Sequence, residues 1–169
     1  MVAVTLYTEE CDMKPDKLLN KTAPAIQLPD KDNNILDIND LKGKWVVVYF
    51  YPKDDTQGCT LEAIDFTKSI EQFKQYNAIV IGISPDSPQS HCRFYDKHNL
   101  NLILLSDTEQ KAAKAYDVWK KKSMYGKSFW GIERSTFLID PDGAVRAVWR
   151  KVKVPGHVEE VLQTLQSFL

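Results

Sequence analysis

The sequence contains few cysteines, almost no net charge and no long apolar run. Its 3 cysteines among 169 residues are too few and too scattered for a disulfide framework. The formal net charge of −1 gives no electrostatic basis for binding nucleic acid or an acidic membrane surface. No apolar run could span a bilayer, and acidic residues stand where a signal peptide would be basic. We therefore expect a cytoplasmic protein with free or redox-active cysteines and with no nucleic-acid or membrane partner.

The length of the chain predicts one domain. A hydrophobic fraction of 43% is ample for a core, and a charged fraction of 27% is ordinary. The first residues give no firm pattern, because Val2, Val4 and Leu6 alternate and would suit either an edge strand or a loose tail. We therefore divide the chain into an N-terminal extension, 1–17, and a single domain, 18–169.

The chain is organised around a strand, a loop and a helix in residues 45–60. Residues 46–51 form an unbroken β-branched and aromatic run, which is typical of a strand buried on both faces. Pro52 ends this strand because it cannot donate to a sheet ladder. After a polar loop, Cys59 directly precedes a helical pattern whose apolar positions share one face, namely Ala63, Phe66, Ile70 and Phe73. Cys59 is therefore predicted to lie in or near the first turn of a helix.

This position favours a reactive cysteine. The unpaired N–H groups and partial positive charge of a helix N-terminus favour the thiolate over the thiol. Thr56 precedes Cys59 by three residues and can hydrogen-bond near its sulfur, and Gly58 permits close approach. The alternative is a buried structural cysteine, for which a polar loop is a poor setting.

Strands and helices alternate in the rest of the chain. A β-hairpin is predicted in 24–41, and further strands in 78–84, 102–105, 135–139 and 144–149, the last two as a hairpin. Helices are predicted in 88–100 after an N-cap at Ser87, from Asp107 with Gln110 in a capping box, and in 158–169. Residues 118–131 are expected to be irregular. The pattern predicts an α/β, thioredoxin-like fold: a central mixed β-sheet flanked by helices, with an N-terminal β-hairpin.

The residues around Cys59 limit the chemistry. Thioredoxin-type exchange commonly uses Cys-x-x-Cys at this junction, but here Thr56 occupies the first of these positions and cannot form a disulfide. One activated cysteine beside a hydroxyl suits attack on an electrophile such as a peroxide O–O bond. Arg134 could stabilise the leaving oxygen if its strand lies beside the strand that ends at Pro52. The alternative for Arg134 is a solvent-exposed side chain.

Four separated segments occur in an order that matches a known family. They are Pro52-x-x-x-Thr56-x-x-Cys59 within YFYPKDDTQGCTLEA, the turn GISPDS with Ser90-His91, Val118-Trp119 with Tyr125-Gly126-Lys127, and GIERSTF, which contains Arg134. Together they resemble the peroxiredoxins, and most closely the Q-type, or bacterioferritin co-migratory protein, branch. The resemblance runs from about residue 18 to the C-terminus.

The resemblance implies a thiol peroxidase that reduces hydrogen peroxide and organic hydroperoxides to water and alcohols in antioxidant defence. Cys59 would be the peroxidatic nucleophile, Pro52 would shield the pocket, and Thr56 would hydrogen-bond the thiolate and the peroxide. Arg134 would stabilise thiolate and transition state, with Glu62 behind it. The Cys59 sulfenic acid would be reduced by thioredoxin or another thiol, and no metal or other cofactor is implied.

The sequence departs from the family at the second cysteine. Many Q-type members carry a resolving cysteine five residues after the peroxidatic one, where this chain has Ile64. Others carry it on the helix after the next strand, at a position closest to Tyr95, and Cys92 lies one turn earlier. Three interpretations stay open: Cys92 resolves, or an external thiol reduces a single-cysteine enzyme, or Cys11 takes part. Cys92 would otherwise be a small core residue.

Two other functions are compatible with a cysteine at this junction. A thiol–disulfide oxidoreductase or isomerase has the same fold, but the missing Cys-x-x-Cys argues against it. A redox sensor or holdase would use Cys59 only as a switch, without turnover. A monomer and a modest dimer both fit the sequence.

Overall fold

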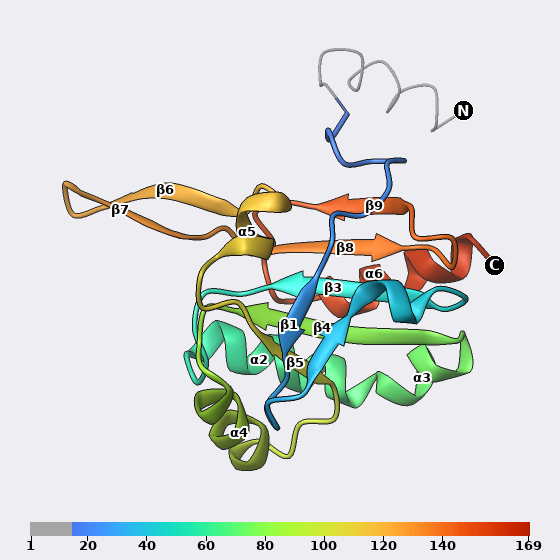
Figure 1. Ribbon diagram of the computed structural model, residues 1–169, viewed down its shortest axis with the longest axis horizontal. Coiled ribbons are helices and arrows are strands. Elements are labelled where there is room, and N and C mark those ends of the chain that lie inside the picture. Colours follow the sequence, from blue (N-terminus) through green and yellow to red (C-terminus); the bar gives the residue numbers. More distant parts are fainter. Residues whose placement is uncertain (1–14) are drawn as a thin grey trace.

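The fold is built on a five-stranded mixed sheet in the order β5-β4-β3-β8-β9 (Figure 1). The computed structural model describes residues 15–169, so Cys11 and the alternatives for the N-terminal tail lie outside the described residues. On one side of β3, strands β4 and β5 run parallel to it. On the other side, β8 pairs antiparallel with β3, and β9 pairs antiparallel with β8. The bounds are β3 Trp45–Phe50, β4 Ala78–Ser84, β5 Ile103–Ser106, β8 Ser135–Ile139 and β9 Val145–Trp149.

The central strand β3 is buried on both faces, as its sequence predicts. Val47 and Tyr49 pack into one core cluster, while Val46, Val48 and Phe50 pack into the cluster on the opposite face. This alternation follows from the twofold period of side chains along a strand. The strand therefore joins the two halves of the core.

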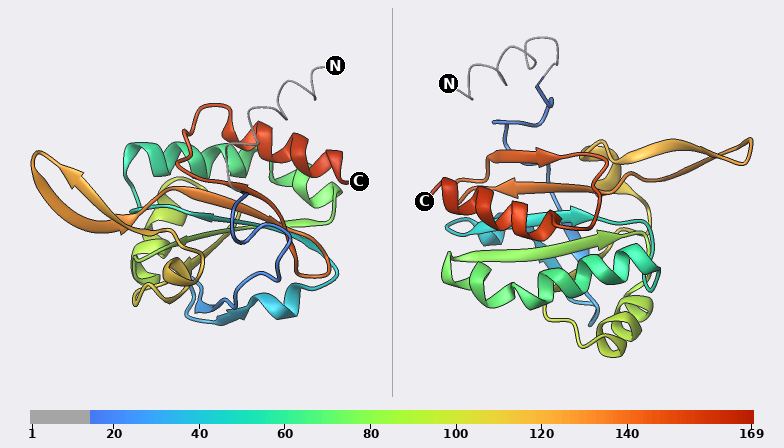
Figure 2. Two further views of the ribbon diagram at one scale, coloured as in Figure 1. Left: turned by 90° about the horizontal axis from the view of Figure 1, so that it is seen from above. Right: turned by 180° about the vertical axis from the view of Figure 1, so that it is seen from behind.

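Helices cover both faces of the sheet (Figure 2). One face carries α2 (Gln57–Lys68), α3 (Ile70–Gln75) and α6 (His157–Ser167). The other face carries α5, the 3₁₀ helix η1 and the β1–β2 hairpin, while α4 lies at the β5 edge of the sheet. The bounds of these elements are α5 Lys111–Ala115, η1 Ile38–Leu41, β1 Gln27–Pro29, β2 Ile35–Asp37 and α4 Pro88–Lys97. This arrangement confirms the predicted fold class.

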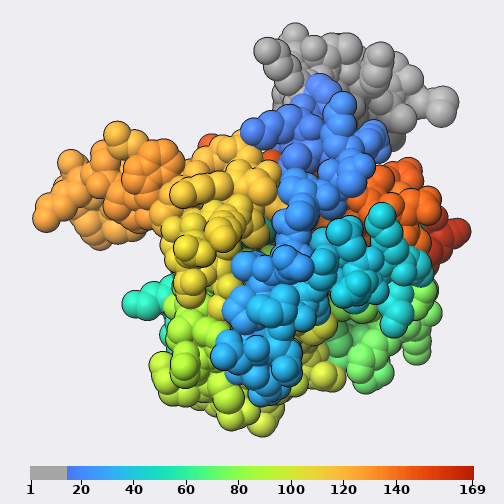
Figure 3. Space-filling view, in the orientation of Figure 1, coloured from blue at the N-terminus to red at the C-terminus, as the bar shows by residue number. Residues whose placement is uncertain are grey.

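Residues 118–131 form a hairpin, so the prediction of an irregular segment is wrong. Strands β6 (Trp119–Met124) and β7 (Lys127–Ile132) pair antiparallel and project from the body of the molecule (Figure 3). Tyr125 and Gly126 join them with φ of 53° and 76°, and positive φ at both positions is the requirement of a type I′ turn. Most of the hairpin is exposed, so no apolar alternation marks its strands in the sequence.

The predicted capping box at the third helix is also wrong. Helix α5 begins only at Lys111, and Gln110 has a φ of 57° and donates its side-chain amide to Thr108 O. Asp107 still satisfies the helix start, because its carboxylate accepts from the backbone N–H groups of Ala112 and Ala113. The loop between Asp107 and α5 is thus longer than a capping box allows. By contrast, Ser87 caps α4 as predicted, with Oγ 3.2 Å from Ser90 N.

Candidate active site

Cys59 lies in the first turn of α2, and residues 51–56 connect this helix to the C-terminal end of β3. The helix begins at Gln57 with Thr56 as N-cap in extended conformation, and Thr60 N donates to Thr56 O at 2.8 Å. The side chain of Cys59 is 1% exposed and its thiol is free. The predicted position at a strand–loop–helix junction is therefore confirmed.

Arg134 reaches Cys59 from the neighbouring strand. Phe50 at the end of β3 pairs with Ser135 at the start of β8, which places Arg134 beside the N-terminus of α2. Arg134 Nη2 lies 3.3 Å from Cys59 Sγ, and its side chain is only 16% exposed. The solvent-exposed alternative for this arginine is therefore excluded. A guanidinium at this distance favours the thiolate through a charge-assisted hydrogen bond.

Glu62 holds the guanidinium from the other side. It lies one helical turn after Cys59 and is fully buried, and its Oε1 accepts from Arg134 Nη1 at 2.6 Å. Burial opposes the charge on Arg134, but Glu62 and Cys59 together outweigh it and raise the pKa of Arg134. Burial raises the pKa of Glu62 to about 7, against the lowering effect of Arg134. Among residues 15–169, Glu62 Oε2 has no hydrogen-bond partner.

The loop before Cys59 leaves room for this arrangement. A Cβ added to Gly58 would lie 3.2 Å from Arg134 Nη2, so a side chain here would crowd the guanidinium. The exposed Thr56 donates its hydroxyl to Lys53 O at 2.9 Å. Pro52 is half-buried at the end of β3. The structure thus joins Cys59, Glu62 and Arg134 by hydrogen bonds, while Pro52 and Thr56 lie in the segment between β3 and α2.

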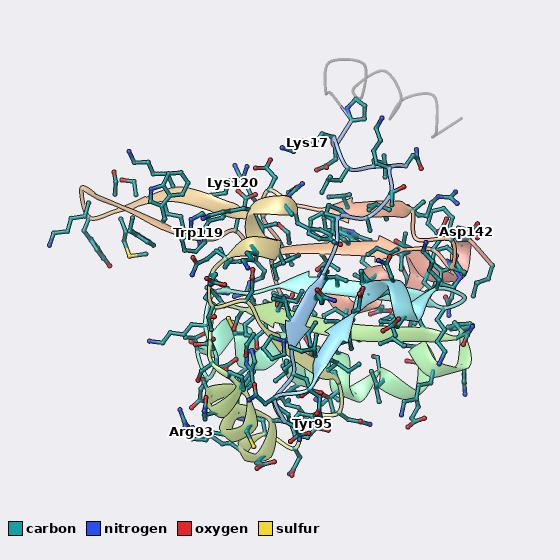
Figure 4. The ribbon with its side chains drawn as sticks, viewed as in Figure 1. Lys17, Arg93, Tyr95, Trp119, Lys120 and Asp142 are labelled. Atoms are coloured by element: carbon teal, nitrogen blue, oxygen red, sulfur yellow. The ribbon has the colours of Figure 1, made fainter. Side chains whose placement is uncertain are left out.

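Lys122 is a second cation beside this site, and the sequence pattern did not reveal it. Its amine donates to Ile132 O, two residues before Arg134. Burial lowers the pKa of Lys122, and the Arg134 guanidinium lowers it further. In the sequence, Lys122 is one of three consecutive lysines that read as a solvated face. Strand alternation in β6 separates the half-buried Lys120 and Lys122 from the exposed Lys121 (Lys120 is labelled in Figure 4).

Cys92 lies apart from this group, on α4. It is half-buried and free, and its Sγ lies 3.9 Å from Asp96 Oδ2 on the same helix. Tyr95, one turn later, faces the β1–β2 turn, where Lys31 Nζ lies 4.6 Å from its ring centre (Figure 4). Within residues 15–169, no three His, Cys, Asp or Glu side chains are grouped so that they could hold a metal ion. No helix in that range is both long and apolar enough for a bilayer.

Comparison with known proteins identifies the family. Residues 19–148 match the model of the AhpC/TSA family. The chain belongs to this family. It is 51% identical to peroxiredoxin Bcp of Bacillus subtilis over 149 residues, which cover 88% of this chain and 95% of that protein. It is 40% identical to peroxiredoxin Bcp of Escherichia coli, with coverage of 86% and 93%.

Solved structures agree with this assignment. The bacterioferritin comigratory protein of Xanthomonas campestris, studied for its alkyl peroxide reduction activity, matches with a TM-score of 0.81 and 42% identity, over 85% of this chain and 91% of that one. Peroxidoxin BcpB of Mycobacterium tuberculosis matches with a TM-score of 0.80 and 29% identity, over 91% and 99%. The protein is therefore a peroxiredoxin, a thiol-dependent peroxidase with a thioredoxin-like fold, and the predicted family and function are confirmed.

Proposed function

We propose that Cys59 is the nucleophile of the peroxidase reaction. Its thiolate attacks one oxygen of the peroxide, so that an S–O bond forms and the O–O bond breaks. The other oxygen leaves, takes up a proton and departs as water from hydrogen peroxide or as an alcohol from an organic hydroperoxide. The product is a Cys59 sulfenic acid. The observation that supports this assignment best is the 3.3 Å contact between Cys59 Sγ and Arg134 Nη2.

Arg134 stabilises the negative charge on the thiolate before attack and the negative charge on the leaving oxygen during attack. Before attack its guanidinium pairs with the thiolate, and during attack it lies close to the oxygen on which negative charge develops. Glu62 fixes its orientation, because the 2.6 Å bond to Nη1 leaves Nη2 directed at sulfur. A planar guanidinium can serve both partners at once, which a lysine ammonium at one point cannot do.

Thr56 and Pro52 complete the site from the loop. In this proposal the Thr56 hydroxyl turns from Lys53 O, which it contacts at 2.9 Å, toward the bound peroxide and the thiolate. Pro52 covers the thiolate side of the pocket and limits access of water. Both residues belong to the segment that joins β3 to α2, so their placement depends on the conformation of that loop.

The sulfenic acid is then reduced by a thiol. If Cys92 is the resolving cysteine, its thiol attacks Cys59 sulfur, water leaves and a disulfide forms, which thioredoxin or another dithiol reduces. Cys59 is 1% exposed within α2, so this route requires unwinding of the first turn of that helix. The other two routes are direct reduction by an external thiol, which makes this a single-cysteine enzyme, and resolution by Cys11.

We also propose a compartment, an oligomeric state and a domain boundary for the enzyme. Free thiols at Cys59 and Cys92 suit a reducing compartment such as the cytoplasm. We propose a monomer or a modest dimer, with 18–169 as the peroxidase domain and 1–17 as an extension. At that boundary, Asp16 is paired with Arg150 at 2.8 Å, so the end of the extension contacts the domain.

Intact-mass measurement and peptide mapping after one equivalent of hydrogen peroxide, without reductant, test the proposal. A loss of two hydrogens that maps to a Cys59–Cys92 bridge supports the two-cysteine route, and the Cys92→Ser variant should then stop at the sulfenic acid. A gain of oxygen confined to Cys59 supports the single-cysteine route, and Cys11→Ser tests the third. If Cys59 stayed unmodified while peroxide persisted, the assignment of the nucleophile would be wrong.

A further inference from the structure

A buried carboxylate lies inside the active-site loop. Asp54 stands midway between Pro52 and Thr56, yet its side chain is only 4% exposed. Aspartate is rarely buried without partners. Here Oδ1 accepts from Tyr51 OH at 2.6 Å, while Oδ2 accepts from Ser90 Oγ at 2.8 Å and is 2.7 Å from His91 Nδ1. We call Tyr51, Asp54, Ser90 and His91 the Asp54 network.

His91 shares a proton with Asp54 in this network. The imidazole is fully buried, and its Nε2 lies 3.0 Å from Leu105 O, which can only accept. Nε2 must therefore donate, and a further proton joins Nδ1 to Asp54. Tyr51 and Ser90 already donate to that carboxylate, and burial raises the pKa of Tyr51 well above its usual value, so Tyr51 keeps its proton. Asp54 Oδ2 and His91 Nδ1 therefore share one proton across 2.7 Å, in a buried hydrogen-bonded pair.

The backbone of the loop is fixed at the same residue. Asp54 N donates to Asp86 Oδ2 at 2.8 Å, and that carboxylate is itself held by Ser84 Oγ at 2.7 Å at the end of β4. The next residue, Asp55, contacts the C-terminal end of α4, with Lys97 Nζ at 2.6 Å and His98 Nε2 at 2.8 Å. These last contacts are exposed and contribute little. The loop is thus attached to α4 mainly through Asp54.

We propose that the buried, hydrogen-bonded pair of Asp54 and His91 is a positioning device for the peroxide site. It fixes the loop between Pro52 and Thr56, and so sets the distance at which Thr56 and Pro52 meet a peroxide above Cys59. This inference rests on the proposed roles of those residues. Tyr51, Asp54, Ser90 and His91 touch neither Cys59 nor Arg134 in the hydrogen bonds of residues 15–169, so they act through the loop.

The rate constants for oxidation and for alkylation of Cys59 distinguish this positioning role from simple stabilisation of the fold. Oxidation of Cys59 by hydrogen peroxide requires the loop geometry. Alkylation by iodoacetamide requires that the buried sulfur be uncovered and ionised, but not that Thr56 and Pro52 contact the reagent. Because small misplacement of reacting groups can cost about 100-fold, we expect Asp54→Asn to slow oxidation by roughly 100-fold. Alkylation should change by no more than about twofold, since Arg134 and Glu62 are untouched.

A matched pair of tyrosines controls for loss of a buried hydroxyl. Tyr51→Phe removes the donor to Asp54, while Tyr116→Phe removes a similar donor to Pro24 O at 2.7 Å on the other side of the sheet. We expect Tyr51→Phe to slow oxidation by roughly 10-fold, about a tenth of the effect of Asp54→Asn, because only one of several bonds is lost. Tyr116→Phe should change neither rate constant. Urea unfolding confirms that both variants are folded.

Three results would overturn the proposal. The first is an Asp54→Asn variant that oxidises as fast as the wild type. The second is a parallel loss of oxidation and alkylation in Asp54→Asn and Tyr51→Phe, which would mean that the network only supports the helix. The third is an equal effect of Tyr116→Phe. Failure of the proposed function looks different, because the wild-type Cys59 itself would then fail to react with peroxide.

Discussion

At the residue scale, the site depends on two small geometric facts. One guanidinium serves a sulfur and a carboxylate at 3.3 and 2.6 Å, and a glycine leaves the space it needs. A local pattern predicts Cys59, because a buried strand and a polar loop place this cysteine at a helix start. The pattern alone leaves Arg134 open, because the pairing of β3 with β8 joins distant segments, and its role comes from the family resemblance. The sequence cannot reveal the Asp54 network, because Asp54 and His91 are brought together by the packing of α4 and not by spacing.

Arg134→Lys tests the double contact of the guanidinium. A lysine keeps the charge but cannot bond sulfur and Glu62 together, so we expect the second-order rate constant for peroxide to fall by roughly 100-fold. Stopped-flow oxidation of Cys59 measures this rate. Arg146→Lys is the matched control, since Arg146 pairs with Asp140 at 3.4 Å and is 40% exposed. Equal rates in Arg134→Lys and wild type would contradict the assigned role.

Gly58→Ala tests the space beside the guanidinium. The new Cβ would lie 3.2 Å from Arg134 Nη2, so Arg134 must shift away from sulfur, and we expect a fall of about 10-fold in the same rate constant. Gly131→Ala is the control, because its Cβ would meet only side-chain atoms at 3.6 Å, an ordinary contact. If Gly58→Ala reacted at the wild-type rate, the glycine would not be needed for the site.

At the element scale, buried strands are far more predictable than exposed ones. The apolar run of β3 fixes its own position, and Pro52 marks its end in the sequence. The β6–β7 hairpin has no buried face along most of its length, and its Tyr125-Gly126 turn is a weaker signal than Asn-Gly. Its pairing is therefore fixed by ladder hydrogen bonds and the turn, which a hydrophobic pattern does not report. Lys122 was missed for this reason.

Lys122→Met tests whether the hairpin contributes charge to the site. Lys122 donates to Ile132 O near Arg134, so its removal loses a cation beside the thiolate and loosens the segment before Arg134. We expect the peroxide rate constant to fall about fivefold, which corresponds to ~1 kcal/mol. Lys121→Met removes the same charge from the exposed side of β6 and should have no effect. Equal losses in both variants would point to net charge alone.

At the scale of the whole molecule, the buried site costs stability. Glu62 lies on the buried face of α2 and has no exposed surface. Burial raises its pKa from 4.5 to about 7. Between these two values the unfolded chain has released the proton while the folded chain still holds it. Stability therefore falls as pH rises from about 4.5 to 7 and is constant with respect to this group outside that window.

Glu62→Gln removes this dependence. A raise of the pKa from 4.5 to about 7 corresponds to roughly 3 kcal/mol between the two ends of the window. The effect of Arg134 on the Glu62 carboxylate is already included in this shift, so the variant adds a pH-independent penalty only for the hydrogen bond to the protonated carboxyl group. We therefore compare the free energy of unfolding of Glu62→Gln with that of its parent. The variant's value relative to the parent should rise by up to roughly 3 kcal/mol between pH 4.5 and 7.

Urea unfolding across this pH range provides the measurement, in a Cys59→Ser background that excludes oxidation and titration of the thiol beside Arg134. Glu71→Gln in the same background is the control, because Glu71 lies on α3 with its side chain 77% exposed. Its stability difference should not follow the same window. A Glu62→Gln difference that stays flat from pH 4.5 to 7 would mean that Glu62 is ionised throughout, and that the Arg134 guanidinium outweighs burial in setting the charge behind the nucleophile.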